Sequence, residues 1–142
     1  MNGIVRQRAR LARVRRIQHG LAASQAAAAA GRVQFLEMNS DRLRRMRSEL
    51  QPIEGPTDGG AMARMGELAM RLDAARHGLS ATIESARGAA LAREAERRAA
   101  RRDQESAERL EQAAVRAADE LAERRFRQAG RRRASLADGD TE

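Results

Sequence analysis

The chain of 142 residues has no cysteine, tryptophan or tyrosine and only two phenylalanines. Without cysteine, disulfides, thiol catalysis and cysteine-based metal sites are excluded. Without aromatic residues, the bulky side chains that dominate globular cores are nearly absent. The hydrophobic fraction of 42% is mostly alanine, which contributes little area when buried. A compact two-layer fold is therefore not expected.

Lysine is also absent, so the basic charge is carried entirely by arginine, as a genome biased toward arginine and alanine codons would produce. Charged residues make up 34% of the chain, and alanine, glutamate, leucine and arginine dominate its composition. This composition is typical of long helices and coiled coils. No segment approaches the ~20 apolar residues that span a bilayer, and no signal-peptide core follows the basic start. A cytoplasmic location is the default expectation.

The two prolines, Pro52 and Pro56, lie in one short stretch with the doublet Gly59-Gly60. Proline interrupts helices and glycine permits a turn, so the pattern predicts a helix over about 3–51, a turn over 52–60 and a second helix over about 61–133. Thr57 and Asp58 are candidate caps of the second helix. The acidic tail, 134–142, is expected to be disordered.

Apolar residues recur at alternating spacings of three and four in both predicted helices, as in a coiled-coil seam. Leu36, Leu43 and Leu50 repeat every seven residues in the first helix, with Asn39 and Met46 between them. Upstream, the predicted stripe continues through Leu11, Val14, Ile17 or Gln18, and Leu21. The second helix repeats the pattern at Met65, Leu68, Leu72, Ala75, Leu79, Thr82 or Ile83, and Ala86, and again at Leu110, Ala114, Ala117 and Leu121.

An antiparallel turn brings these two stripes into register if facing residues have numbers that add to about 111. Leu43 then faces Leu68, and Leu36 faces Ala75. The predicted fold is all-α, an antiparallel coiled-coil hairpin that forms within a single monomeric chain. Its second helix is longer, and residues from about Glu111 onward are expected to project beyond the paired part.

No constellation of catalytic or metal-binding residues stands out. His19 and His77 lie far apart in the sequence and are expected to be solvated helix residues. The segment GPTDGG lacks the lysine and the preceding strand of a phosphate loop. Enzymatic activity is not expected, and no cofactor or metal is implied.

The net charge is +8, and the first helix carries most of it. Such an arm can bind phosphates electrostatically without sequence preference. The near absence of aromatics for base stacking argues against specific nucleic-acid binding. Two alternatives follow from these residues: a basic coiled coil that binds nucleic acid or an anionic surface, and a generic coiled-coil scaffold that dimerises.

The basic start RQRARLARVRR, the break near residue 55 and the long second helix that closes with DELAERRFRQAGRRR together resemble the flagellar FliJ family. These proteins are stalks of the bacterial flagellar type III export apparatus. The resemblance implies a non-enzymatic protein that couples the hexameric export ATPase to the cytoplasmic domain of the membrane export gate and exchanges with export chaperones. It also implies peripheral association with the inner face of the cell membrane through the gate.

The family's gate contact implies two sets of residues beside the turn, at four-three-four spacing. In this sequence they are Asn39, Leu43, Met46 and Leu50 on the first helix and Leu68, Leu72, Ala75 and Leu79 on the second. The family's aromatic residues are aliphatic or methionine here, and its histidine is leucine. These eight positions can also be simply the hairpin seam. The apolar residues nearest the tip are Met46, Leu50, Met62 and Met65.

The resemblance further implies that the far end of the hairpin enters the ATPase ring. Residues expected to contact the ring are Arg6, Arg10 and Arg13 on the first helix and Leu110, Leu121 and Phe126 on the second.

Overall fold

The computed structural model describes residues 2–50, 55–56 and 58–137. Within these ranges the chain forms two helices and no strand: α1, Asn2–Glu49, and α2, Gly59–Ala137. The predicted all-α hairpin is confirmed. Helix α2 continues four residues past the predicted end at Arg133, and residues 138–142 of the predicted tail lie outside the described residues.

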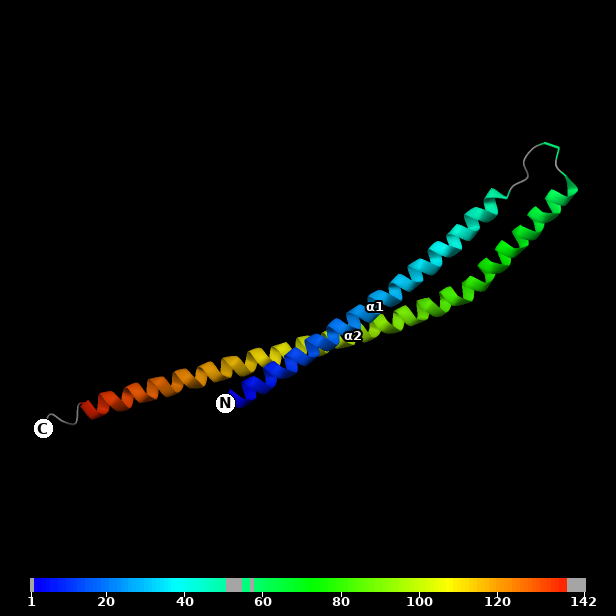
Figure 1. Ribbon diagram of the computed structural model, residues 1–142. Coiled ribbons are helices and arrows are strands. Elements are labelled where there is room, and N and C mark those ends of the chain that lie inside the picture. The colour runs from blue at the N-terminus through cyan, green and yellow to red at the C-terminus, as the bar shows by residue number, and fades with distance from the viewer. Residues whose placement is uncertain (1, 51–54, 57, 138–142) are drawn as a thin grey trace. The chain divides into compact units, whose positions relative to one another are not determined.

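The chain divides into two compact units, each containing part of both helices. Unit 1 comprises residues 1–21 and 98–142, and unit 2 comprises residues 22–97. In Figure 1 the cyan part of α1 runs antiparallel beside the green part of α2 within unit 2, and the blue start of α1 runs beside the yellow part of α2 within unit 1.

Asp58 caps the start of α2. Its carbonyl accepts hydrogen bonds from the amides of Ala61 and Met62, at 3.0 and 3.1 Å, and its carboxylate accepts one from the amide of Gly60 at 3.3 Å. This confirms one of the two predicted caps; Thr57 and Pro52 lie outside the described residues. The predicted role of the glycine doublet is wrong, because Gly59 and Gly60 belong to α2. The left-handed backbone conformation is at Gly55, whose φ is +147°.

The predicted register is wrong. In unit 2, Arg47 pairs with Asp73 at 3.1 Å and Glu37 pairs with Arg87. In unit 1, Arg15 pairs with Asp103 at 3.2 Å. Residues that face each other therefore have numbers adding to about 120 rather than 111. Leu36 packs with Ile83 and Ala86 and not with Ala75, and the same register moves Leu43 away from Leu68.

Unit 2 has a small apolar core. Leu36, Ile83 and Ala86 are buried together, and Val33 and Leu79 pack against them. The inward positions of α1 recur at spacings of three and four. They are Val33, Leu36, Ser40, Leu43, Arg47 and Leu50, all buried or half-buried. The predicted leucine repeat is therefore confirmed, but Ser40 and Arg47 fill the intermediate positions that were predicted for Asn39 and Met46.

Unit 1 is packed on alanine. Ala12 is 1% exposed and Ala107 is 3% exposed. The register places Ala12 opposite Ala107. The predicted seam of Leu11, Val14, Ile17 and Leu21 is wrong, because all four side chains are exposed. Small side chains allow two helices to approach closely, so the positions with the largest apolar residues are not the ones that this pair buries.

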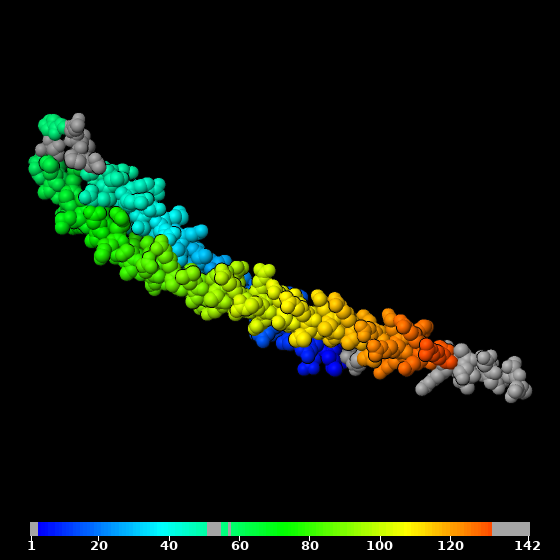
Figure 2. Space-filling view, turned by 180° about the vertical axis from the view of Figure 1, so that it is seen from behind, coloured from blue at the N-terminus to red at the C-terminus, as the bar shows by residue number. Residues whose placement is uncertain are grey.

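The overhang of α2 begins later than predicted. Ala114 and Ala118 are still half-buried, whereas every residue from Asp119 to Arg131 is exposed. Figure 2 shows the orange end of α2 continuing beyond the blue start of α1 within unit 1. The shift from Glu111 follows from the corrected register, which brings the start of α1 level with residues near 119.

Candidate interaction site

Ion pairs between α1 and α2 hold each unit in register. In unit 2 the Arg87 guanidinium donates two hydrogen bonds to Glu37 Oε1, at 3.1 and 2.7 Å, and one to Glu84 on its own helix. The hydrogen bond to Glu37 is the main cause of the raised pKa of Arg87. In unit 1, Arg16 donates to Glu108 at 3.1 Å. Gln104 and Arg16 both donate to Glu108, which lowers the pKa of that carboxyl.

The eight residues that the sequence assigns to gate binding lie in unit 2, and they divide into two groups. Met46, Leu68 and Ala75 are exposed. The other five are half-buried between or beside the helices: Asn39, Leu43, Leu50, Leu72 and Leu79. Leu79 packs against the buried cluster of Leu36. Only the exposed group is free to meet a partner without disturbing the pair.

Three large exposed side chains of unit 2 were not assigned a role from the sequence: Phe35, Met38 and Met70. Together with Met46, Met62 and Leu68 they are the large apolar side chains exposed between residues 35 and 70, and we call this set the tip surface; Leu68 and Met70, two positions apart on α2, face different sides of it. Methionine is flexible and polarizable, and it suits surfaces that adapt to a partner. The signal in the sequence was available, because five of the six methionines fall between Met38 and Met70 and one of the two phenylalanines immediately precedes them.

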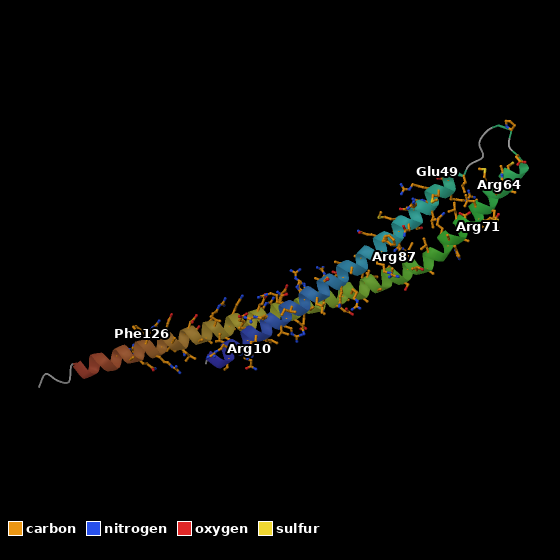
Figure 3. The ribbon with its side chains drawn as sticks, viewed as in Figure 1. Arg10, Glu49, Arg64, Arg71, Arg87 and Phe126 are labelled. Carbon is orange, nitrogen blue, oxygen red and sulfur yellow. The ribbon has the colours of Figure 1, made fainter. Side chains whose placement is uncertain are left out.

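The six residues assigned to the ATPase ring lie in unit 1, and all are exposed: Arg6, Arg10, Arg13, Leu110, Leu121 and Phe126. Phe126 is 81% exposed. Figure 3 labels Arg10 near the start of α1 and Phe126 on the part of α2 that extends past that start. The structure therefore places Phe126 and Arg10 at different levels of unit 1.

The prediction that both histidines are solvated is half wrong. His77 is exposed, but His19 is half-buried on the inward side of α1 in unit 1. Its Nε2 atom is buried without a hydrogen-bond partner among the described residues, as is the Oε1 atom of Gln104. Because burial without a hydrogen bond costs free energy, these two polar groups weaken the alanine-packed pair.

Metal binding has no candidate site in the described parts of the chain. They contain no group of three or more acidic, histidine or cysteine side chains placed to hold a metal ion. An open groove beside His77 is lined by Ser40, Ser80 and Arg87 among others. The Ser80 hydroxyl donates to the backbone carbonyl of His77 at 2.6 Å, a local helix contact. Neither described helix has a segment of the length and hydropathy that a membrane crossing requires.

No protein-family model matches the chain, and no curated protein or solved structure matches it significantly.

Proposed function

We propose that the protein is a non-enzymatic stalk of the bacterial flagellar type III export apparatus, similar to the FliJ family. In this role it links the export ATPase ring to the export gate and exchanges with export chaperones. It works in the cytoplasm at the inner face of the membrane, where it is held by the gate.

The observation that carries the proposal is the unequal length of the helices in unit 1. From Asp119 to Arg131 the side chains of α2 are all exposed, and the helix itself continues to Ala137. A helix in a protein gains most of its stability from packing an apolar face against a partner. Leu121 and Phe126 give this segment apolar side chains that are exposed and have no partner among the described residues, so entry into a ring would cover them.

The tip surface supplies a second contact, for the gate. It carries six exposed apolar side chains, and methionines make up most of them. Surface leucines scattered singly need no explanation. Phe35, Met38 and Met46, however, share one face of α1 by their spacing, and this exposed apolar group supports an interaction site. Within the eight residues first assigned to the gate, the proposal now depends on Met46, Leu68 and Ala75.

Pull-down with the export ATPase and with the cytoplasmic domain of the export gate tests the proposal. We expect Leu121→Ala with Phe126→Ala to weaken ATPase binding and leave gate binding unchanged. Met38→Glu with Met46→Glu should have the opposite effect. Arg124→Gln, on the overhang, is a control for the first pair. If the wild-type chain binds neither partner, the stalk assignment is wrong.

A second candidate function follows from charge alone. No aspartate or glutamate precedes Glu37, while seven arginines do. Such an arm binds polyanions without sequence preference, and the affinity falls steeply with salt. A salt-dependent mobility shift with duplex DNA, together with no binding to the ATPase, would favour this function over the stalk.

A further inference from the structure

Helix α1 carries a second, exposed stripe at coiled-coil spacing in unit 1. Its six members follow each other at spacings of three and four, and we call them the outer stripe: Ile4, Gln7, Leu11, Val14, Gln18 and Leu21. All six are exposed, with Ile4 at 59% and Leu21 at 61%. None is charged, although six arginines lie in the same part of α1.

The inward side of α1 is poorer in large apolar groups than the outer stripe. The half-buried positions next to Ala12 are occupied by Arg8, Arg15 and His19. A stripe that alternates by three and four keeps to one face of a helix that supercoils around a partner. Helix α1 therefore has two such faces, one on α2 and one without a partner among the described residues.

Helix α2 contributes an apolar residue, Leu110, to the side of unit 1 on which the outer stripe lies. Leu11 directly precedes the inward Ala12, and Leu110 directly precedes the inward Glu111. In an antiparallel pair, positions that precede corresponding inward residues lie on the same flank. The register brings Leu11 and Leu110 to the same level, and Leu110 is also exposed. An open groove along α1 is lined by Ile4, Gln7, Leu11 and Val14 together with Arg8 and Arg10.

We propose that the outer stripe, with Leu110, binds an amphipathic helix of a partner protein, one with apolar residues at three-four spacing and acidic residues on both flanks. The six positions extend over about 27 Å of helix at 1.5 Å per residue. Within the described part of the chain, Arg8, Arg10 and Arg13 form no ion pair, whereas Arg15 and Arg16 are paired with Asp103 and Glu108. Of these, Arg8 and Arg10 line the groove beside the stripe and would face the acidic flanks.

The arginines of α1 argue against a second copy of this chain as the partner of the outer stripe. Two copies that met through this stripe would oppose Arg8 and Arg10 to the same residues, since α1 has no acidic side chain before Glu37. Opposite charges across an interface select partners, and like charges reject them. A polyanion would not require an uncharged apolar stripe. A helix that lies in a membrane surface presents tryptophan, phenylalanine or leucine opposite its basic face, and the outer stripe has neither tryptophan nor phenylalanine.

The inference depends on unit 1 alone. It shares Arg10 and Leu110 with the residues expected to contact the ATPase ring, but the peptide test below uses neither the ATPase nor the gate, so its result and that of the pull-down are distinguishable. The probe is a synthetic 21-residue helical peptide with leucine and isoleucine at three-four spacing and glutamate at both flanking positions. A second peptide carries lysine in place of each glutamate. Binding to the full chain is measured by fluorescence anisotropy, and circular dichroism verifies that each variant keeps its helix content.

We expect the glutamate peptide to bind the wild-type chain and the lysine peptide to bind at least about tenfold more weakly. Leu11→Ala with Val14→Ala should weaken binding of the glutamate peptide by about tenfold or more, and Arg8→Gln with Arg10→Gln should weaken it in a salt-dependent way. Leu91→Ala is the matched control, because Leu91 is 74% exposed and lies in unit 2. It should change affinity less than about twofold.

Failure of the glutamate peptide to bind, or equal binding of the two peptides, overturns the proposal. Two further measurements test the other occupants. If sedimentation velocity shows a dimer that Leu11→Ala with Val14→Ala abolishes, the stripe is a self-association face. If the same variant abolishes binding to phosphatidylglycerol vesicles, it is a lipid contact.

Discussion

Glu37 of α1 and Arg87 of α2 are joined by two hydrogen bonds to the same carboxylate oxygen, at 3.1 and 2.7 Å. The residues are fifty positions apart in the sequence. Beside them, Leu36 is buried with Ile83. One ionic and one apolar contact thus fix the same register in unit 2.

This register predicts which cysteines can be joined. Because the chain has no cysteine, a variant with Leu36→Cys and Ile83→Cys gives an unambiguous disulfide. We expect it to form within one chain on mild oxidation. The variant with Leu36→Cys and Ala75→Cys, which follows the register expected from the sequence, should not. Gel electrophoresis without reductant separates the outcomes, and links found only between chains would contradict the hairpin.

Removal of the cross-helix ion pair should have a small effect. The two side chains are about half exposed, Arg87 at 51% and Glu37 at 42%, and ion pairs that water reaches contribute little. Glu37→Gln is expected to lower the Tm slightly, with a smaller decrease in high salt. Glu84→Gln removes only the contact within α2 and serves as the control. An equal effect of the two substitutions would show that Glu37 does not hold the helices together.

The apolar core of unit 2 should be more sensitive. Ile83 is buried in the cluster with Leu36. Ile83→Ala is expected to lower the free energy of unfolding by about 2 kcal/mol, through lost burial and the cavity left behind. Leu91→Ala, at an exposed position, should change it by less than about 0.5 kcal/mol. Urea unfolding followed by circular dichroism measures both, and similar values would place the core elsewhere.

His19 predicts a substitution that stabilises the chain. Its buried Nε2 has no hydrogen-bond partner among the described residues. His19→Leu replaces this group with an apolar side chain of similar size and is expected to raise the free energy of unfolding by about 1 kcal/mol. His77→Leu, at an exposed position, is the control. A lower stability of His19→Leu would mean that the histidine has a partner in solution.

Glu108 predicts a loss of stability in acid. Hydrogen bonds from Gln104 and Arg16 lower the pKa of its carboxyl in the folded chain. A group with a lowered folded pKa stabilises the fold above its unfolded value, about 4.3 for glutamate, and loses this contribution as pH falls through the folded value. Tm measured from pH 7 downward should show the loss. Glu108→Gln should reduce it, and Arg16→Gln should reduce it partly, because Gln104 still donates.

The fold class could be read from the sequence because composition and the single cluster of helix breakers left few alternatives. Leu36, Leu43 and Leu50 were recognised as inward residues because large apolar side chains and the seam coincide there. In unit 1 they do not coincide. There the outer stripe holds the large residues and the seam holds alanine, so a search for large apolar residues selected the wrong face.

The register predicted from the sequence was wrong for a related reason. The sum of about 111 assumed that the helices begin to pair at the turn, whereas Arg47 is level with Asp73, well inside α2. Ionic partners such as Glu37 and Arg87 were hidden among many possible pairs in a charge-rich chain. Phe35 and Met38 lie outside the seam, so the three-four pattern of apolar residues gives no signal for them.

The alanine seam of unit 1 has a mechanical consequence. After a slide of one heptad along α2, Ala12 would meet Ala100 or Ala114 in place of Ala107, with almost the same van der Waals contact. Burial alone therefore discriminates poorly among such positions. The Arg15–Asp103 and Arg16–Glu108 pairs resist the slide, and salt weakens them. Ionic strength should consequently set how firmly the register is held within unit 1, whereas the buried contact of Leu36 with Ile83 holds it in unit 2.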